Sequence, residues 1–262
     1  MTGGRDGAAA GAAELAGNTF AARLAKAVAA ADSLACVGLD PHPKHTAPGE
    51  IDDFCRRIVD LTADYAAAFK PNSAFFEAAG PRGLDALAAL HEFVPPGRLL
   101  ILDAKRGDIA STAAAYAQAA FDVIGADAVT VNPYLGGDAV APFLADPARG
   151  AFVLCRTTNL GADDFQSLEV AGESLYLAVA RRAVSWNRAD NVGLVVGATD
   201  PAALWEVRRL APGLPFLVPG VGAQGGALHE AVAAGLDEAG GGLLVASSRS
   251  VVYADDPRAA AR

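Results

Sequence analysis

The sequence predicts a single-domain α/β fold in which eight parallel strands close into a (β/α)8 TIM barrel. Three observations carry this prediction. Short apolar runs alternate with longer amphipathic segments along the chain, and continuous apolar runs suit strands buried on both faces, as in parallel sheets. The 262 residues match the roughly 250 that such a barrel takes. No internal linker rich in Pro, Gly or Ser divides the chain. A doubly wound parallel sheet is the alternative for this pattern.

Eight apolar runs are the candidate strands, and nearly every one ends on a polar or special residue. They span 33–40, 66–72, 98–105, 126–134, 151–157, 191–199, 215–222 and 242–249. The carboxyl ends of barrel strands form the active face of this fold. We therefore expect polar residues that follow different strands to meet around one mouth.

The segments between these runs have helical periodicity. Apolar residues at i, i+3 and i+4 spacing predict helices over 51–65 and 173–188. Ser111 is the expected N-cap of a helix over 112–124. Pro201 suits the first turn of a later helix, because its missing N–H is not needed there.

Composition excludes several classes of protein. The net charge of −9 argues against a general binder of nucleic acid or of anionic membranes. The sequence contains no run of about 18 or more uncharged apolar residues, so we expect no transmembrane helix. Residues 1–17 lack the apolar stretch of a signal peptide, so we expect a disordered tail there and a barrel domain over 18–262. The three cysteines and four histidines show neither metal-ligand spacing nor a disulfide framework, which fits a reducing cytoplasm.

The strongest chemical signal is LLILDAKRGDIAST, over 99–112. Side chains alternate faces on a strand, so Asp103 and Lys105 should point the same way, and Asp108 follows beyond a glycine. Neighbouring opposite charges favour the ionised form of each group, which makes Lys105 a ready proton donor. A salt-bridged surface loop is the alternative, and the apolar run before the charges disfavours it.

The second signal is the glycine-rich segment VPGVGAQGG. Gly220, Gly222 and Gly225 satisfy the G-x-G-x-x-G pattern of dinucleotide sites. That pattern should open the first strand–helix unit, whereas this copy follows the seventh candidate strand. Backbone amides after the last two barrel strands instead form a phosphate site, to which Gln224 and Arg249 can add side-chain donors. A plain glycine-rich turn is the other interpretation.

Together these motifs resemble the orotidine 5′-phosphate decarboxylase family, in its longer, mycobacterial-type branch. Strands ending in GLDP and FKPN precede LDAKRGDIAST, and CRTTNLGADDFQ and VPGVGAQGG follow it in the family's order. The match runs from about residue 35 to 253 and so covers most of the chain. The D-x-K-x-x-D pattern alone is shared with a wider suprafamily, whereas its combination with GLDP, FKPN and GAQGG is far more specific.

The resemblance implies decarboxylation of orotidine 5′-monophosphate to uridine 5′-monophosphate in de novo pyrimidine biosynthesis, without cofactor or metal, by a cytoplasmic homodimer with shared active sites. The catalytic charge array would be Lys70, Asp103, Lys105 and Asp108, with Lys105 protonating the carbanion at pyrimidine carbon 6. The resemblance would place Asp40 at a ribose hydroxyl, Thr158 at the pyrimidine amide edge, and Gln224 and Arg249 at the 5′-phosphate. Gly222, Gly225 and Ser248 also belong to this substrate-binding set. Ile109 and Thr112 would enter the site from the partner subunit, together with Asp108.

Two residues depart from the family pattern, and two other functions remain as alternatives. Family members commonly have Ser and Pro where this chain has Thr158 and Leu160, and a Thr still offers the hydroxyl. A metal-dependent phosphosugar lyase of the same suprafamily would need acidic Mg²⁺ ligands at the mouth, where Lys70 stands. A non-catalytic nucleotide-binding barrel is the other alternative, and the intact set of charges argues against it.

Overall fold

The eight predicted strands are confirmed, and they form a closed parallel barrel. The computed structural model describes residues 17–221 and 228–262, so the tail predicted over 1–17 lies, apart from Gly17, outside the described residues. The strands are β1 (Ala35–Leu39), β2 (Ala68–Pro71), β3 (Leu99–Arg106), β4 (Ala128–Val131), β5 (Gly150–Arg156), β8 (Val192–Val196), β9 (Phe216–Val218) and β10 (Leu243–Ser247). Their order around the barrel follows the chain, and β1 pairs with both β2 and β10. This closure decides against the doubly wound sheet.

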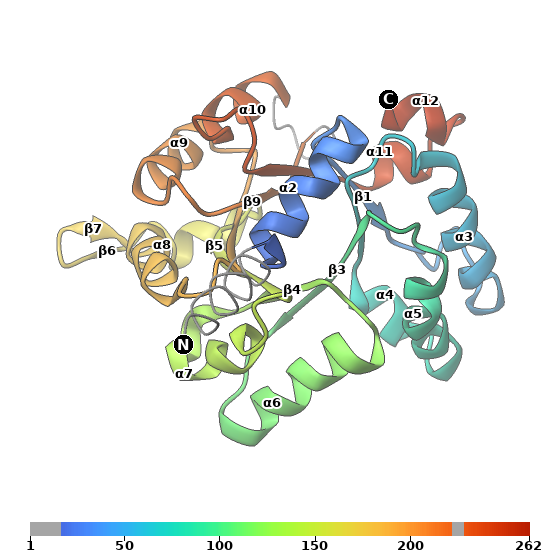
Figure 1. The fold of residues 1–262 in the computed structure, drawn as a ribbon, viewed down its shortest axis with the longest axis horizontal. Helices are drawn as coiled ribbons and strands as arrows, with labels where there is room; N and C mark the ends of the chain where they lie inside the picture. Colours follow the sequence, from blue (N-terminus) through green and yellow to red (C-terminus); the bar gives the residue numbers. More distant parts are fainter. Residues whose placement is uncertain (1–16, 222–227) are drawn as a thin grey trace, which may run out of the picture.

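Helices connect the strands and form an outer ring (Figure 1). They are α3 (Ile51–Thr62), α4 (Ser73–Ala78), α5 (Pro81–Phe93), α6 (Ala110–Gln118), α7 (Gly137–Val140), α8 (Leu175–Trp186), α9 (Pro201–Leu210), α10 (Leu228–Gly235), α11 (Arg249–Val252) and α12 (Pro257–Ala261). Short 3-10 turns occur at η1 (Pro48–Glu50), η3 (Pro133–Leu135), η4 (Ala141–Leu144) and η5 (Leu160–Asp164). A two-stranded antiparallel hairpin, β6 (Glu169–Val170) and β7 (Glu173–Ser174), stands apart from the barrel.

The predicted helix starts give one success and one error. α9 begins at Pro201, and the Asp200 carboxylate caps it by accepting the Ala203 N–H. The predicted cap at Ser111 is wrong, because α6 already begins at Ala110. There the Asp108 carboxylate accepts the Ile109 N–H at 2.8 Å, and Ala110 adopts a φ of 49°. This turn starts the helix before Ser111, and a π-helical segment, η2 (Ala119–Val123), follows it.

Alternation along the strands divides the core into two layers. On β1, Val37 and Leu39 pack outward against the helices, whereas Cys36 faces the barrel interior. One more helix, α2 (Phe20–Ala31), packs on that interior, and Figure 1 shows it lying across the middle of the barrel. This helix was not predicted from the sequence. Its Phe20 ring meets Phe152 edge to face, with centroids 5.6 Å apart.

The three cysteines are free and buried. Burial raises the pKa of the Cys36 and Cys155 thiols to about 12, because a thiolate loses its hydration inside the protein. Neither thiol is ionised at neutral pH. They are small core side chains.

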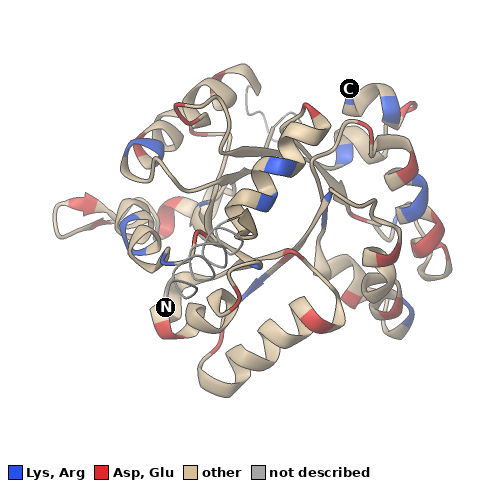
Figure 2. Ribbon diagram, in the orientation of Figure 1, with Lys and Arg blue, Asp and Glu red and all other residues tan. Residues whose placement is uncertain are grey.

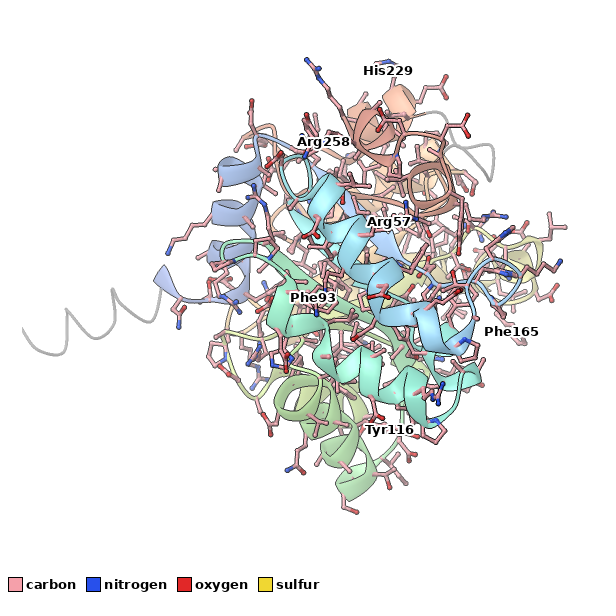
Figure 3. The ribbon with its side chains drawn as sticks, turned by 90° about the vertical axis from the view of Figure 1, so that its right-hand side faces the viewer. Arg57, Phe93, Tyr116, Phe165, His229 and Arg258 are labelled. Carbon is pink, nitrogen blue, oxygen red and sulfur yellow. The ribbon has the colours of Figure 1, made fainter. Side chains whose placement is uncertain are left out.

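Outer surfaces carry both signs of charge. Figure 2 shows acidic and basic residues distributed around the outer helices. The side view of Figure 3 separates two ends of the molecule: α2 lies near one end, and Phe165, in the loop after β5, lies near the other. Within the described ranges, no helix is long and apolar enough to cross a membrane.

Candidate active site

A cavity of about 610 Å³ opens at the carboxyl ends of the barrel strands. Every strand of the barrel contributes a lining residue from its later part or from the loop that follows it. The prediction that polar residues after different strands meet at one mouth is therefore confirmed. This is the face on which barrel enzymes carry their active sites.

One carboxylate holds the charged part of the cavity together. Asp103 Oδ2 accepts from Lys70 Nζ at 2.9 Å, and Asp103 Oδ1 accepts from Lys105 Nζ at 2.6 Å. The Thr130 hydroxyl also donates to Asp103 Oδ1, at 2.9 Å. The site is thus a Lys–Asp–Lys array supplied by the adjacent strands β2 and β3, to which Thr130 of the neighbouring strand β4 adds a hydroxyl.

Both members of the buried pair are held in their charged forms. Burial alone lowers the pKa of Lys70, but the carboxylates of Asp103 and Asp40 more than offset this and raise that pKa above the usual value for lysine. Burial alone also raises the pKa of Asp103, but the ammonium groups of Lys70 and Lys105 hold it well below its usual value. Lys105 differs from Lys70 in exposure, since its side chain is 47% exposed and that of Lys70 is 9% exposed.

Lys105 does not lie on a regular strand next to Asp103, as the predicted alternation of side chains would require. The register of β3 against β4 shifts between Leu102 and Arg106, and Lys105 adopts a φ of 48°. A left-handed backbone is costly for a residue with a Cβ and is found where the surroundings enforce it. Here the Lys105 N–H donates to Thr130 Oγ1 at 2.9 Å. The two side chains meet as predicted, but through an irregular strand end.

The end of β1 forms a second polar edge of the cavity. The Asp40 carboxylate accepts the Asn72 N–H at 3.2 Å, and the Asp40 carbonyl accepts from the Tyr253 hydroxyl at 2.9 Å. The Tyr253 oxygen in turn accepts the His42 N–H at 2.8 Å. Asp40 is therefore fixed by the loops after β1 and β2 and by the chain beyond α11.

The end of β10 adds Ser248 and Arg249 to the lining. Ser248 packs over β1 at Gly38, where an added Cβ would lie 2.6 Å from the Ser248 Cβ. The Ser248 hydroxyl is buried and has no hydrogen-bond partner in the described part of the chain. The Arg249 side chain is exposed at the mouth.

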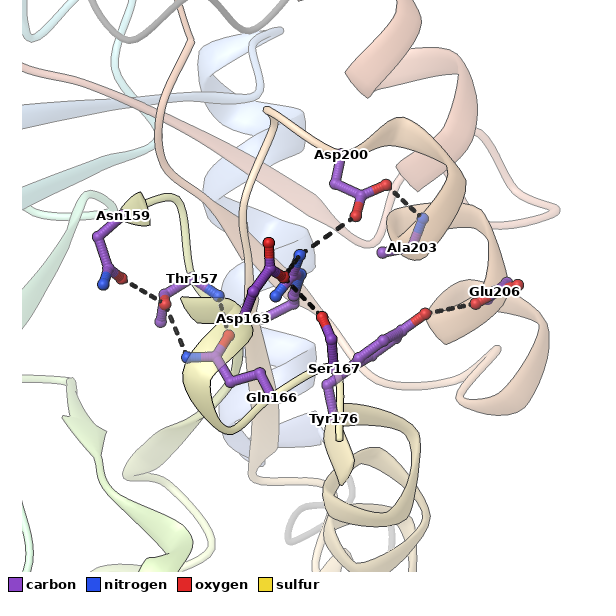
Figure 4. A network of polar contacts seen from close by, with 10 residues as sticks. Thr157, Asn159, Asp163, Gln166, Ser167, Tyr176, Asp200, Ala203 and Glu206 are labelled. Atoms are coloured by element: carbon purple, nitrogen blue, oxygen red, sulfur yellow. Dashed lines mark hydrogen bonds and ion pairs between the residues drawn. The ribbon is translucent and has the colours of Figure 1, made fainter. Parts of the chain in front are cut away.

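The loop after β5 closes another side of the cavity with Thr157, Thr158, Asn159 and Gln166. Figure 4 shows Gln166 directed at Thr157, with Asn159 beyond it. Thr158 is the one residue of this loop that the sequence predicted as a site residue. It lies between Thr157 and Asn159, to which the sequence assigned no role.

Three predicted site residues stand apart from this cavity, and three others cannot be placed relative to it. Asp108, Ile109 and Thr112 do not line it, and the Ile109 side chain is 57% exposed. Gly222, Gln224 and Gly225 lie outside the described residues.

Sequence reasoning missed Thr130 and Asn72. Thr130 is the one polar residue inside the run AVTV of β4, and a lone hydroxyl at an inward position of a barrel strand was the available signal. Asn72 ends the FKPN motif, which by itself gives this residue no role. No group of three or more His, Cys, Asp or Glu capable of holding a metal ion occurs among the residues that the structure describes.

The family model that matches this chain is described as "Orotidine 5'-phosphate decarboxylase / HUMPS family" and covers residues 33–262. A protein of Thermomicrobium roseum named orotidine 5'-phosphate decarboxylase is 52% identical over 90% of this chain and 88% of its own length. One from Azoarcus with the same name is 52% identical, over 88% and 90%.

Solved structures agree with these relatives. The OMP decarboxylase of Leishmania donovani matches with a TM-score of 0.87 and 48% identity, over 93% of this chain and 94% of its own. A Toxoplasma gondii structure titled as a putative orotidine-monophosphate-decarboxylase matches with a TM-score of 0.90 and 43% identity, over 93% of each chain. The chain belongs to the orotidine 5′-phosphate decarboxylase / HUMPS family.

Proposed function

We propose that this chain is an orotidine 5′-phosphate decarboxylase, which converts orotidine 5′-monophosphate to uridine 5′-monophosphate and carbon dioxide in pyrimidine biosynthesis. The observation that carries this proposal is the Lys70–Asp103–Lys105 array in the cavity. It supplies a cation where negative charge develops and a proton for the carbon that loses its carboxylate.

In this proposal, side chains of the protein supply every group that the decarboxylation requires. The bond between carbon 6 and the carboxylate breaks, and its electron pair stays on carbon 6 while carbon dioxide leaves. Lys105 stabilises that carbanion electrostatically and then donates a proton from Nζ to form the new C–H bond. Its 47% exposed side chain can regain the proton from solvent. Asp103 and Lys70 hold the Lys105 ammonium in place, and no step requires a cofactor or metal.

Substrate binding extends across the mouth. In this proposal Asp40 bonds a ribose hydroxyl and Thr158 meets the amide edge of the pyrimidine. Arg249 and Ser248 bind the 5′-phosphate together with Gly222, Gln224 and Gly225. The unpartnered Ser248 hydroxyl supports this assignment, because a buried polar group without a partner costs stability unless a ligand satisfies it.

We further propose a cytoplasmic homodimer in which Asp108, Ile109 and Thr112 complete the partner's cavity. These residues lie off the cavity of their own chain, and 57% exposure of the Ile109 side chain supports a role at a contact between subunits.

Turnover is tested by adding purified protein to orotidine 5′-monophosphate and following the loss of its absorbance. We expect complete conversion to uridine 5′-monophosphate, with the rate unchanged after prolonged treatment with a chelator. Turnover that the chelator abolishes and Mg²⁺ restores would contradict a metal-free site and favour the metal-dependent alternative. Binding without conversion would support the non-catalytic barrel.

A further inference from the structure

We propose that Gln166 is a positioning residue for pyrimidine recognition, which it serves by clamping Thr157 and thereby fixing Thr158. The inference rests on the proposed function, since it assigns Thr158 to the pyrimidine. Gln166 acts through the loop after β5 and not on the reacting carbon.

The clamp uses both ends of the Gln166 amide (Figure 4). Oε1 accepts the Thr157 N–H at 2.9 Å, and Nε2 donates to Thr157 Oγ1 at 2.8 Å. A backbone N–H can only donate, so it fixes which end of the amide carries the oxygen. The Thr157 hydroxyl accepts a hydrogen bond from Gln166 and therefore donates its own hydrogen bond to Asn159 Oδ1, at 2.7 Å. Each donor in this chain of bonds has one acceptor.

Gln166 is itself anchored at both backbone groups. Its N–H donates to the Ala162 carbonyl at 2.8 Å, and its carbonyl accepts the Tyr176 N–H, at 3.0 Å, in the first turn of α8. The amide therefore transmits the position of α8 to the strand end at Thr157. A loop without these bonds would not hold Thr157 at a fixed position relative to α8.

Thr158 has little room to move between this clamp and β8. A Cβ added to Gly197, the residue after β8, would lie 2.4 Å from Thr158 Cγ2. The glycine thus lets the Thr158 methyl group rest against the β8 backbone. Hydrogen bonds at Thr157 and Asn159 flank Thr158 in the chain, and its methyl group packs against Gly197.

The clamp acts on one side of the cavity only. The loop after β5 and the Arg249 end of β10 are separated by β8 and β9 in the barrel order. Loss of the clamp should therefore weaken contacts to the pyrimidine and spare those to the phosphate. This selectivity separates a positioning role from general damage to the fold.

The test compares uridine 5′-monophosphate with ribose 5-phosphate, which lacks the pyrimidine, as competitive inhibitors of decarboxylation. In Gln166→Ala we expect the inhibition constant of uridine 5′-monophosphate and the KM for substrate to rise about tenfold, as for the loss of one or two hydrogen bonds. The constant for ribose 5-phosphate should stay within about twofold. Gln166→Glu keeps an acceptor for the Thr157 N–H but loses the donor, so it should show the same selectivity.

Three further variants complete the design. Ser167→Ala, in the same loop, removes a bond to Asp163 between two residues that do not line the cavity and should leave both inhibition constants unchanged. Thr157→Ser keeps the hydroxyl and should behave as the wild type, whereas Thr157→Val should add little to Gln166→Ala, because the two residues act as one unit. Equal losses for both inhibitors, or none, in an enzyme whose wild type decarboxylates substrate would overturn the proposal. A wild type without turnover would instead reject the proposed function.

Discussion

At the residue scale, the site depends on how Asp103 is shared. One carboxylate accepts from two ammonium groups and a hydroxyl, so it balances the charge of Lys70 and aims Lys105. The Thr130 hydroxyl has two tasks, since it also accepts the N–H of Lys105. That bond holds the left-handed backbone of Lys105, and a residue strained in this way is typical of active sites.

Removing the shared carboxylate should destabilise the protein. Asp103→Asn leaves the buried Lys70 ammonium without its main partner, and breaking one side of a buried pair costs about 3–5 kcal/mol. Chemical denaturation at pH 7 should show a loss of about 3 kcal/mol in the free energy of unfolding. Much of it should return in the double variant Lys70→Met/Asp103→Asn.

The pH dependence follows from the direction of each shift. The folded pKa of Asp103 lies below its unfolded value of about 3.9, so its contribution is present above about pH 4 and is lost as the pH falls further. The folded pKa of Lys70 lies above about 10.4, so its contribution is lost only as the pH rises beyond that value. The gap between wild type and Asp103→Asn should be constant over about pH 5–9 and shrink in acid. Equal stability of the two proteins at pH 7 would contradict this account.

At the scale of elements, Arg208 ties together the loops around β9 and β10. Its buried guanidinium donates to carbonyls at Ala211, Leu214, Gly235 and Gly242, which lie at the ends of α9 and α10 and just before β9 and β10. The same group stacks over the Phe216 ring, 3.7 Å from its centroid. One side chain thus satisfies backbone oxygens from two strand–helix units.

Arg208→Ala should lower the free energy of unfolding by about 3 kcal/mol or more, because it removes a buried donor from several carbonyls at once and the Phe216 ring loses its partner. The matched control is Arg209→Ala, because the exposed Arg209 side chain stacks on Trp205. This substitution should change stability by about 0.5 kcal/mol or less. Thermal and denaturant unfolding measure both. If the two variants were equally stable, the carbonyl network would not hold these loops.

Periodicity was enough to predict the eight strands and several helices, but not α2 or the irregular ends of the elements. The apolar runs set all eight strands, since each is buried on both faces. Ser111 misled because Asp108 and the left-handed Ala110 start α6 instead. In the site, Asp103 and Lys105 were predictable from spacing, whereas Gln166 was not. Its partner Thr157 lies nine residues away, and only the folded loop brings the two together.

At the scale of the whole molecule, the central expectation is a cavity completed by a second subunit. An isologous dimer has two equivalent sites. Asp103 of one chain would then serve that chain's own cavity, whereas Asp108 of the same chain would serve the cavity of its partner. Asp103→Asn and Asp108→Asn, prepared separately, should each be nearly inactive. Mixed dimers would place both substitutions in one site and neither in the other.

Mixing these variants under conditions of subunit exchange should therefore restore activity. Random exchange makes about half of the dimers mixed, so roughly a quarter of all sites regain wild-type composition. Specific activity should rise toward that fraction of the wild type. No gain despite exchange demonstrated by labelled subunits would mean that Asp103 and Asp108 serve the same site.

The account as a whole depends on Lys105 as the proton donor to carbon 6. The most direct measurement is kcat for Lys105→Ala with orotidine 5′-monophosphate, alongside Arg249→Ala, whose loss should appear mainly in KM because a phosphate contact is made in ground and transition states alike. Removal of a general acid costs about 10²–10⁴-fold, and loss of charge stabilisation adds to it. We expect Lys105→Ala to lose at least that factor while still binding uridine 5′-monophosphate. A Lys105→Ala enzyme whose kcat stays within about tenfold of wild type, far short of that factor, would contradict the mechanism.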